Sequence, residues 1–278
     1  MSVKTLIFGA RSNLSKQLHI CINDTVLVSS SDFLDNKNYL EHYQNEEVQI
    51  IINSFYPASK LNDFSEPLKY IQDTIYIFAN LLEQIKLLSL NVKKIIYTSS
   101  ASVYGNNNYC NENDNLMPLN LQASLKVSSE KLLKGFCNDM KIDYVIARVF
   151  NMYGKNDNFS VISKIINSVL DKETIPLINS GTAIRDFIHI NDVVKSYIKL
   201  LDLTTSQTVN IASGDGVSIK MILDYLKLKG YTIDIENSCR DEIKVSIANV
   251  EKLNMILDTS NFNKVVDFIE TELQKEIN

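Results

Sequence analysis

The first residues that could do chemistry lie in a turn near the N-terminus, where an apolar run gives way to a helical pattern. Gly9 begins this turn, and Ser12 and Ser15 follow it in the spacing G-x-x-S-x-x-S. Backbone N–H groups of such a strand-to-helix turn can hold the pyrophosphate of a dinucleotide. Glycines at the second and third places would let the backbone approach the phosphates and the helix pack on the strand, and serine is the mildest replacement. An ordinary strand-to-helix turn is the alternative, but we predict that a dinucleotide contacts Gly9, Arg11, Ser12, Asn13 and Leu14.

The choice of dinucleotide depends on the end of the second apolar run. This run continues into Ser29, Ser30 and Ser31, without the carboxylate that normally accepts hydrogen bonds from the adenosine ribose of NAD. Ser29 and Ser30, together with Arg11, could instead bind a 2'-phosphate. The pattern favours NADP(H) as the cofactor, with NAD(H) as a possible one. The alternative for Arg11 is a solvated loop cation.

Later candidate residues fall in short stretches after further apolar runs. In chain order these are Ser99-Ser100-Ala101-Ser102-Val103-Tyr104-Gly105, Glu112, Pro118-Leu119-Asn120, Lys126 with Glu130, Arg148-Val149-Phe150-Asn151-Met152-Tyr153-Gly154, residues 181–193, and Val209-Asn210-Ile211-Ala212-Ser213-Gly214. They resemble the motifs of the extended short-chain dehydrogenase/reductase family, of the nucleotide-sugar epimerase and reductase type. The resemblance covers nearly the whole chain and implies an α/β fold: a doubly wound Rossmann sheet with a smaller, discontinuous substrate-binding domain near the C-terminus.

The resemblance also implies a catalytic dyad, Y-x-x-x-K, on the helix after the fourth strand. Lys126 matches the lysine, which holds the nicotinamide ribose, and Ser100 matches the catalytic serine, but Gln122 stands in the place of the tyrosine. A carboxamide cannot release and regain a proton at neutral pH as a phenol beside a lysine can. Lys126, Ser100 or the nearby phenol of Tyr104 would have to relay the proton, while Gln122 could polarise a carbonyl through a hydrogen bond.

The residues after Ser100 help to distinguish the reactions of this family. Dehydratases of this family have an Asp-Glu pair there, whereas this chain has Ala101-Ser102. The short chain and the arginine in the first turn resemble the NADPH-dependent reductases that complete 6-deoxy sugars, such as GDP-fucose synthase and dTDP-4-dehydrorhamnose reductase. We therefore expect an NADPH-dependent reductase of an NDP-4-keto-6-deoxy sugar, with or without epimerase activity. The alternatives are an NDP-sugar 4- or 2-epimerase and a non-catalytic binding protein that has lost the tyrosine.

The nucleotide-sugar would be held by residues of the later motifs. By resemblance, Arg185 binds the diphosphate, for which the fork of a guanidinium is suited, and Asn151 reaches the sugar or its phosphates. Ser100 and Arg240 complete the predicted substrate contacts. A structural cap or a surface ion pair is the alternative for Arg185 and Asn151. We expect His189 and Asp192, in the same motif as Arg185, to be structural.

The elements that must position these residues are visible as alternating patterns. Short β-branched runs at Val3–Phe8, Thr25–Val28, Val48–Ile52, Val92–Thr98 and Tyr144–Phe150 alternate with helical spacing at Tyr70–Leu88 and Ala123–Phe136. This alternation is typical of parallel strands with crossover helices. We predict a dinucleotide-binding domain at 1–154 and 187–212, and a nucleotide-sugar-binding domain at 155–186 and 213–278.

Composition restricts the other classes of function. The net charge is −5, with acidic and basic residues interspersed, so no basic surface is expected for nucleic acid. The four cysteines form no C-x-x-C pair, which argues against a metal site and a disulfide scaffold. No apolar run is long enough to span a membrane, and we expect a cytoplasmic protein. The resemblance implies a homodimer, formed through the helices at Tyr70–Leu88 and Ala123–Phe136.

Overall fold

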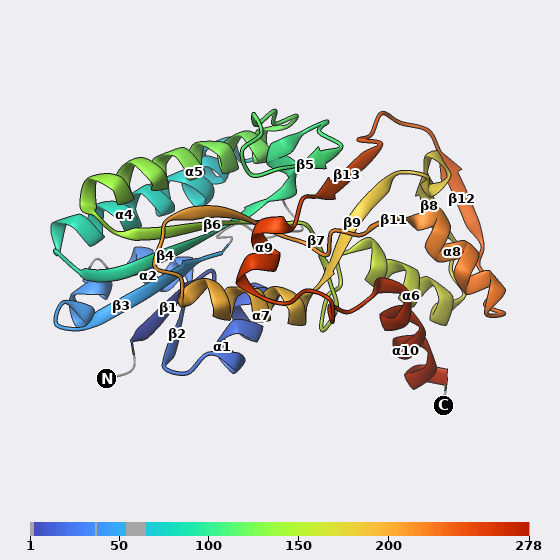
Figure 1. Cartoon of the computed structure of the whole chain (residues 1–278), viewed down its shortest axis with the longest axis horizontal. Helices are drawn as coiled ribbons and strands as arrows, with labels where there is room; N and C mark the ends of the chain where they lie inside the picture. Colours follow the sequence, from blue (N-terminus) through green and yellow to red (C-terminus); the bar gives the residue numbers. More distant parts are fainter. Residues whose placement is uncertain (1–2, 37, 54–64, 278) are drawn as a thin grey trace. The chain divides into compact units, whose positions relative to one another are not determined.

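Figure 1 shows the computed structural model, which describes residues 3–36, 38–53 and 65–277. The chain divides into two compact units. Unit 1 comprises Met1–Val103, Pro118–Arg148 and Val194–Val209, and unit 2 comprises Tyr104–Met117, Val149–Val193 and Asn210–Asn278. Both units are therefore assembled from separate stretches of the chain. That one domain binds a dinucleotide and the other a nucleotide-sugar stays a prediction, as do the predicted domain bounds.

Unit 1 is built on a six-stranded sheet, and the predicted fold class is confirmed. The sheet order is β10-β6-β4-β3-β1-β2, with β1 Lys4–Phe8, β2 Thr25–Val28, β3 Glu47–Ile52, β4 Asn91–Ser100, β6 Asp143–Val149 and β10 Gln207–Ile211. β1 pairs in parallel with both β2 and β3, and β3 pairs in parallel with β4. From β1 the chain thus runs to β2 at one edge of the sheet, and it then crosses to β3 on the other side of β1. Doubly wound sheets bind ligands at this reversal, beyond the carboxyl ends of the strands.

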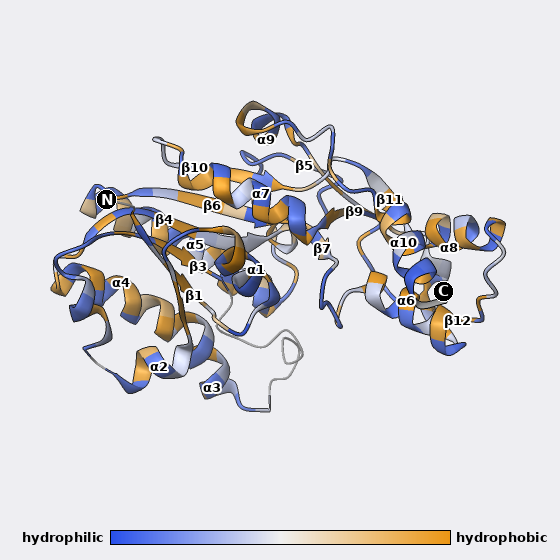
Figure 2. Cartoon of the chain, turned by 90° about the horizontal axis from the view of Figure 1, so that it is seen from below, coloured by the Kyte–Doolittle hydropathy of each residue, from blue (hydrophilic) through white to orange (hydrophobic). Residues whose placement is uncertain are grey.

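The helices of unit 1 cover both faces of this sheet. They are α1 Asn13–Cys21, α2 Ser30–Asp35, α3 Pro67–Ile71, α4 Ile77–Leu87, α5 Leu121–Met140 and α7 Ile190–Leu201, with a π-helical segment at Gln72–Tyr76 and a 3-10 turn at Tyr39–Tyr43. In Figure 1, α4 and α5 lie along one face, and α1 and α7 lie along the other. Figure 2 shows hydrophobic and hydrophilic faces on these helices, as expected for helices that pack on a sheet.

The core of unit 1 explains several residues that could also have served a dimer interface. Ile77, Leu81 and Leu133 are fully buried in one cluster with strand residues such as Leu6, Ile50 and Ile95. Burial of one such side chain contributes about 1.5–3 kcal/mol. Leu132 is exposed on α5, and Tyr76 and Leu87 are exposed on the stretch Tyr70–Leu88, so these side chains are accessible for the predicted dimer.

Two buried polar side chains attach α7 to the sheet. Lys94 of β4 donates from Nζ to the carbonyl oxygens of Leu200, at 3.1 Å, and Leu201, at 2.8 Å, and also to that of Leu203. Gln49 of β3 donates to the Leu201 carbonyl at 3.1 Å. The last carbonyls of a helix lack partners within it, and these side chains supply donors from residues far away in the sequence.

Unit 2 consists of short strands and three helices around a separate apolar core. One sheet has the order β11-β9-β13-β5, with β7 paired to β9, and a second pairs β8 with β12. The strands are β5 Tyr109–Cys110, β7 Asn151–Tyr153, β8 Ile175–Ile178, β9 Ile184–His189, β11 Gly216–Ser218, β12 Ile235–Ser238 and β13 Val245–Ala248. The core lies under α6 Val161–Asp171, α8 Ile219–Leu228 and α10 Val265–Ile277, while α9 Glu251–Ile256 lies outside this cluster. No helix of the described residues is both long and apolar enough to cross a bilayer.

Candidate functional site

The predicted phosphate turn closes β1 and opens α1. Gly9 has a φ of 91°, a conformation that favours glycine, and its N–H donates to the carbonyl of Val28 at 3.0 Å. Ser12 is the N-cap of α1, and its hydroxyl accepts from the N–H of Ser15. The turn therefore presents a helix N-terminus, which can hold an anion. Arg11 is exposed on it, and the side chain of Leu14 is buried, so only the backbone of Leu14 can face a ligand.

The serine in place of the third glycine is part of a buried hydrogen-bond network. Ser15 is fully buried, and its hydroxyl accepts from Ser12 Oγ at 2.8 Å and from Asn53 Nδ2 at 2.7 Å. Asn53 is the residue directly after β3, and it is also buried. The sequence reasoning above missed Asn53, although a polar residue directly after an apolar strand, at the edge where ligands bind, could have indicated it.

The predicted 2'-phosphate residues have local partners. Ser29 caps α2 by accepting from the N–H of Asp32 at 3.0 Å, and its hydroxyl lies 2.9 Å from that of Ser31. Ser30 is the first residue of α2 and is half-buried. Asp32, in the first turn of α2, is exposed. A carboxylate therefore lies close to the end of β2 after all, which weakens the sequence argument for a 2'-phosphate.

Lys126 is held over the end of β4. Its Nζ donates to the carbonyl of Thr98 at 2.6 Å and lies 4.9 Å from the centre of the Tyr97 ring. Burial lowers the pKa of Lys126 to about 8, while the carboxylate of Glu130 opposes this shift. A lysine with such a pKa exchanges its proton near neutral pH, and perturbed groups of this kind are frequent at functional sites.

The other two predicted catalytic residues lie on the same two elements as Lys126. Ser100 ends β4 and accepts from the N–H of Ser102 at 3.2 Å. Gln122 lies in the first turn of α5, one turn before Lys126, and residues at this spacing share a helix face. Asn120 fixes the start of α5 by accepting from the N–H of Ala123 at 2.9 Å. β4 and α5 thus hold the three side chains on packed elements of unit 1.

A buried ion pair fixes α5 against β4 and β6. Glu130 of α5 accepts from Arg148 Nη2 at 2.7 Å, from Arg148 Nε at 3.1 Å and from Ser99 Oγ at 2.5 Å. Both charged side chains are almost fully buried. Removing one partner of such a pair costs far more than the pair contributes. The family residues Glu130 and Arg148 therefore set the position of α5, and so of Lys126.

Tyr104, which the sequence left open as a proton relay, has a structural role. Its side chain is fully buried, and its hydroxyl donates to Asn210 Oδ1 at 2.6 Å. Asn210 in turn donates to the carbonyls of Cys110 and Asn249. Tyr104 thus joins segments within unit 2, and its phenol is committed to Asn210.

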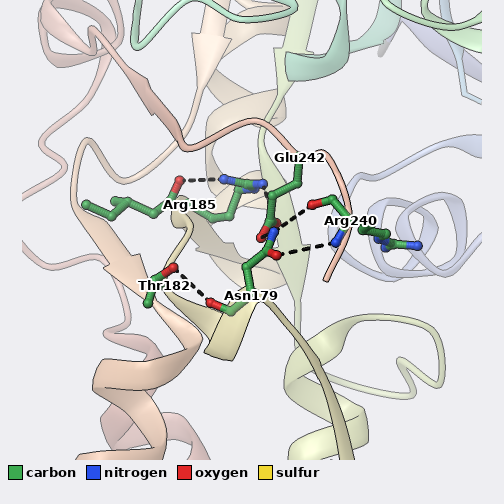
Figure 3. A network of polar contacts seen from close by, with 6 residues as sticks. Asn179, Thr182, Arg185, Arg240 and Glu242 are labelled. Atoms are coloured by element: carbon green, nitrogen blue, oxygen red, sulfur yellow. Dashed lines mark hydrogen bonds and ion pairs between the residues drawn. The ribbon is translucent and has the colours of Figure 1, made fainter. Parts of the chain in front are cut away.

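Arg185 lies in a polar network of unit 2 (Figure 3). Its Nη2 is 3.3 Å from Glu242 Oε2, and its Nη1 donates to the carbonyl of Ile184. Asn179 Nδ2 donates to Glu242 Oε1 at 2.9 Å and to the carbonyl of Arg240 at 2.7 Å. Burial lowers the pKa of Arg185, and Glu242 opposes the shift. The guanidinium therefore already binds one carboxylate, while the side chain of Arg240 is exposed and points away from it.

Asp186, next to Arg185, organises the backbone around it. Its carboxylate accepts from the N–H groups of Ser213, Gly214 and Ala248 and from the hydroxyl of Ser213. Burial raises the pKa of Asp186 to about 6 against these hydrogen bonds. Asn151 is exposed and donates to the carbonyl of Asp186 at 2.8 Å, so Asn151 and Arg185 flank one ordered stretch of β9.

The remaining residues of this motif pack or cap other elements. The ring of His189 contacts Tyr153 edge-on, with centroids 5.3 Å apart. A Cβ on Gly154 would lie 2.3 Å from that ring, which requires glycine there. Asp192 accepts from the N–H of Asn263 at 2.7 Å. These contacts agree with a structural role for His189 and Asp192.

A family model matches this chain. The model of the NAD dependent epimerase/dehydratase family matches residues 9–212, which is more than half of the chain and includes the phosphate turn, Lys126 and Arg185. The chain belongs to this family. Its members epimerise, dehydrate or reduce nucleotide-sugars.

Known proteins of this family show how far the likeness extends. The chain is 27% identical over 180 residues to a dTDP-D-glucose 4,6-dehydratase of Dictyostelium discoideum, covering 60% of this chain and 41% of that protein. It is 25% identical over 189 residues to a dTDP-4-dehydro-6-deoxyglucose reductase of Escherichia coli, covering 66% and 58%. The aligned part thus spans less than two thirds of either relative. A UDP-glucuronic acid 4-epimerase of Bacillus cereus, solved with UDP-glucuronic acid and NAD, has a TM-score of 0.80 at 21% identity and covers 99% of each chain. This last likeness shows the fold.

Proposed function

We propose that this chain is an NAD(P)H-dependent reductase of a nucleoside-diphosphate 4-keto-6-deoxy sugar, in which Lys126 delivers the proton. The observation that carries the proposal is the position of Lys126: its Nζ lies 2.6 Å from the Thr98 carbonyl, with a pKa of about 8. At neutral pH such an amine is mostly protonated, yet it can release the proton readily. Gln122, where the family has tyrosine, cannot do so.

The residues of unit 1 fit a dinucleotide. The turn at Gly9 and the capped N-terminus of α1 present backbone N–H groups suited to a pyrophosphate. A bound nicotinamide cofactor would supply the hydride that reduces the carbonyl carbon. The hydroxyl chain of Ser29 and Ser31 accommodates a 2'-phosphate, whereas the nearby Asp32 suits an unphosphorylated ribose. We propose that the chain uses either cofactor.

The proton is delivered from unit 1. As the carbonyl oxygen gains negative charge, Lys126 donates its proton to that oxygen and becomes neutral, and water then reprotonates the amine. Ser100, at the end of β4, donates a hydrogen bond to the same oxygen. Gln122 holds the carbonyl through its Nε2 without transferring a proton. The change from carbonyl to alcohol is thus balanced by one hydride and one proton.

The nucleotide-sugar is held by unit 2 in this proposal. Arg185 and Arg240 bind the diphosphate, and Asn151 binds the sugar or its phosphates. Support comes from the ordered backbone on which Arg185 lies, because Asp186 fixes it through four hydrogen bonds. Exposed Leu132 is available for the homodimer that we also propose. We place the protein in the cytoplasm.

The test is an assay with purified protein. NADH and NADPH are each supplied with dTDP-linked and GDP-linked 4-keto-6-deoxy sugars, and cofactor oxidation is followed together with the product by NMR. We expect oxidation with at least one pair, and a loss of about 100-fold or more in kcat for Lys126→Met. No oxidation by the wild type with any pair, although both ligands bind, would refute the reductase.

An epimerase is the second candidate, because the overall fold matches an epimerase solved with NAD. It would interconvert UDP-sugars without consuming added cofactor, and NAD would co-purify with it. The same preparations, incubated with UDP-glucose or UDP-glucuronic acid alone and examined by NMR, separate the two. Binding without either reaction would point to the non-catalytic alternative.

A further inference from the structure

The strongest unexplained feature of unit 1 is a chain of hydrogen bonds that crosses the sheet at its carboxyl edge. Asn53 Oδ1 accepts from Thr98 Oγ1, and Asn53 Nδ2 donates to Ser15 Oγ at 2.7 Å. Beyond these, the Tyr197 hydroxyl lies 2.6 Å from Thr98 Oγ1. Because Thr98 gives its only hydroxyl proton to Asn53, Tyr197 must be the donor to Thr98. The network therefore runs in one direction from α7 to α1.

Asn53 lies where the sheet opens. The pairing of β3 with β4 ends at Ile52 and Tyr97, and that of β1 with β3 ends at Phe8 and Ile52. Asn53 comes next, and its N–H still donates to the Phe8 carbonyl at 3.0 Å. Its side chain then connects β4 on one side with α1 on the other. Asn53 thus connects the neighbouring strands beyond their last paired residues, at the place where the strand order reverses.

The hydrogen-bond network connects two parts of the proposed site, the phosphate turn and the place where Lys126 is held. At one end, Ser15 and Ser12 fix the start of α1 and the phosphate turn. At the other end, Thr98 is held by its hydroxyl, and the carbonyl of the same residue binds Lys126. Asn53 is 4% exposed, so water cannot easily replace its contacts, and a buried amide that loses its partners is costly.

We propose that Asn53 is a positioning residue, which holds the phosphate turn and the Lys126-binding carbonyl of Thr98 in a fixed relation. This proposal rests on the function proposed above, in which Lys126 delivers the proton. Ser12 and Ser15 are then working parts of the turn, since a glycine at the place of Ser15 would offer Asn53 no acceptor.

The test uses readouts that do not require turnover. The first is the pKa of Lys126, measured from the pH dependence of its acetylation by acetic anhydride with mass spectrometry. The second is the dissociation constant of ADP, which can contact the phosphate turn but has no nicotinamide ribose. The groups around Lys126 other than Thr98, namely Glu130 and the Tyr97 ring, are unchanged in every variant.

Four variants separate positioning from general loss of stability. Asn53→Ala should lower the pKa of Lys126 by half a unit or more, because a poorly held carbonyl stabilises the ammonium less well, and should weaken ADP binding about fivefold. Thr98→Val keeps the carbonyl and the contact of Asn53 with Ser15, so it should lower the pKa alone. Thr98→Ser keeps the hydroxyl that donates to Asn53, so it should leave the pKa of Lys126 at the wild-type value. Gln49→Ala, which removes another buried amide from β3, should change neither readout.

The proposal fails if Asn53→Ala and Thr98→Val leave the pKa of Lys126 at the wild-type value, or if Thr98→Ser behaves like Thr98→Val. A rise of the pKa would also overturn it, because that would report water reaching the amine. An inactive wild type would refute the reductase but would leave these measurements valid, so the two failures can be told apart.

Discussion

Gln122 and Lys126 lie one helical turn apart on α5, and their side chains differ in whether they can carry a proton. The lysine is held by the Thr98 carbonyl with a pKa of about 8, whereas the carboxamide has no ionisable proton near neutral pH. In unit 2, Arg185 offers five N–H donors, and its contacts to Glu242 and Ile184 use two of its nitrogens. Burial lowers the pKa of both cations, and a nearby carboxylate, Glu130 or Glu242, opposes each shift.

Glu242→Gln should tighten the binding of nucleoside diphosphates. The glutamine keeps an oxygen for Asn179 but removes the negative charge beside Arg185. A partly exposed ion pair contributes up to about 1 kcal/mol, so we expect roughly fivefold lower dissociation constants for UDP and dTDP by isothermal titration calorimetry. Glu236→Gln, an exposed change in β12, is the control. Weaker binding by Glu242→Gln would show that the carboxylate is itself a ligand contact.

The end of α7 depends on side chains from the sheet. Lys94 donates to carbonyls at the end of α7, although Lys94 is itself almost fully buried and burial lowers its pKa. A helix end buried without donors is unfavourable. α5 is also held by a side chain from the sheet, but through the buried ion pair of Glu130 with Arg148 and not through its end carbonyls.

Lys94→Met should destabilise the protein by about 2 kcal/mol, because the buried carbonyls lose their donor. The methionine fills a similar volume, so the effect reports the hydrogen bonds and not a cavity. The measurement is urea unfolding followed by circular dichroism. Lys93→Met, at the exposed neighbouring position, should change stability by less than about 0.5 kcal/mol, and equal effects of the two changes would contradict the role of Lys94.

The strands were predictable because their signal is local. Runs such as Val48–Ile52 and Tyr144–Phe150 appear within a residue or two of their predicted bounds, as β3 Glu47–Ile52 and β6 Asp143–Val149. The contacts of the site were not predictable in this way. Asn53 meets Ser15, and Arg185 meets Glu242, across long sequence separations that only the folded chain brings together. The family motifs supplied Lys126 and Arg185, but no motif includes Asn53 or Glu242.

The raised pKa of Asp186 makes the stability of the folded protein depend on pH. Its pKa is raised to about 6 by burial, above the value of about 3.9 in an unfolded chain. The folded state therefore binds the proton more tightly, and the stabilisation by protonation is complete below about pH 4 and is lost as pH rises through 6. The loss amounts to about 3 kcal/mol.

Urea unfolding between pH 4 and 7 should show this decline in the wild type, with an excess uptake of about one proton by the folded state. Asp186→Asn should remove that slope, and it should also lower stability at every pH, because its amide faces backbone N–H groups that now lack an acceptor. Asp215→Asn, on the exposed side of the same turn, should retain the slope. An unchanged slope in Asp186→Asn would assign it to other groups.

The attachment of α7 to the sheet also has a consequence for the order of events during synthesis. Gln49 and Lys94 emerge from the ribosome long before Leu200 and Leu201, the residues whose carbonyls they bind. Until then, a lysine and an amide on the central strands have no native acceptor and must stay hydrated. These native contacts can form only after the intervening residues, 150–193 among them, have been made.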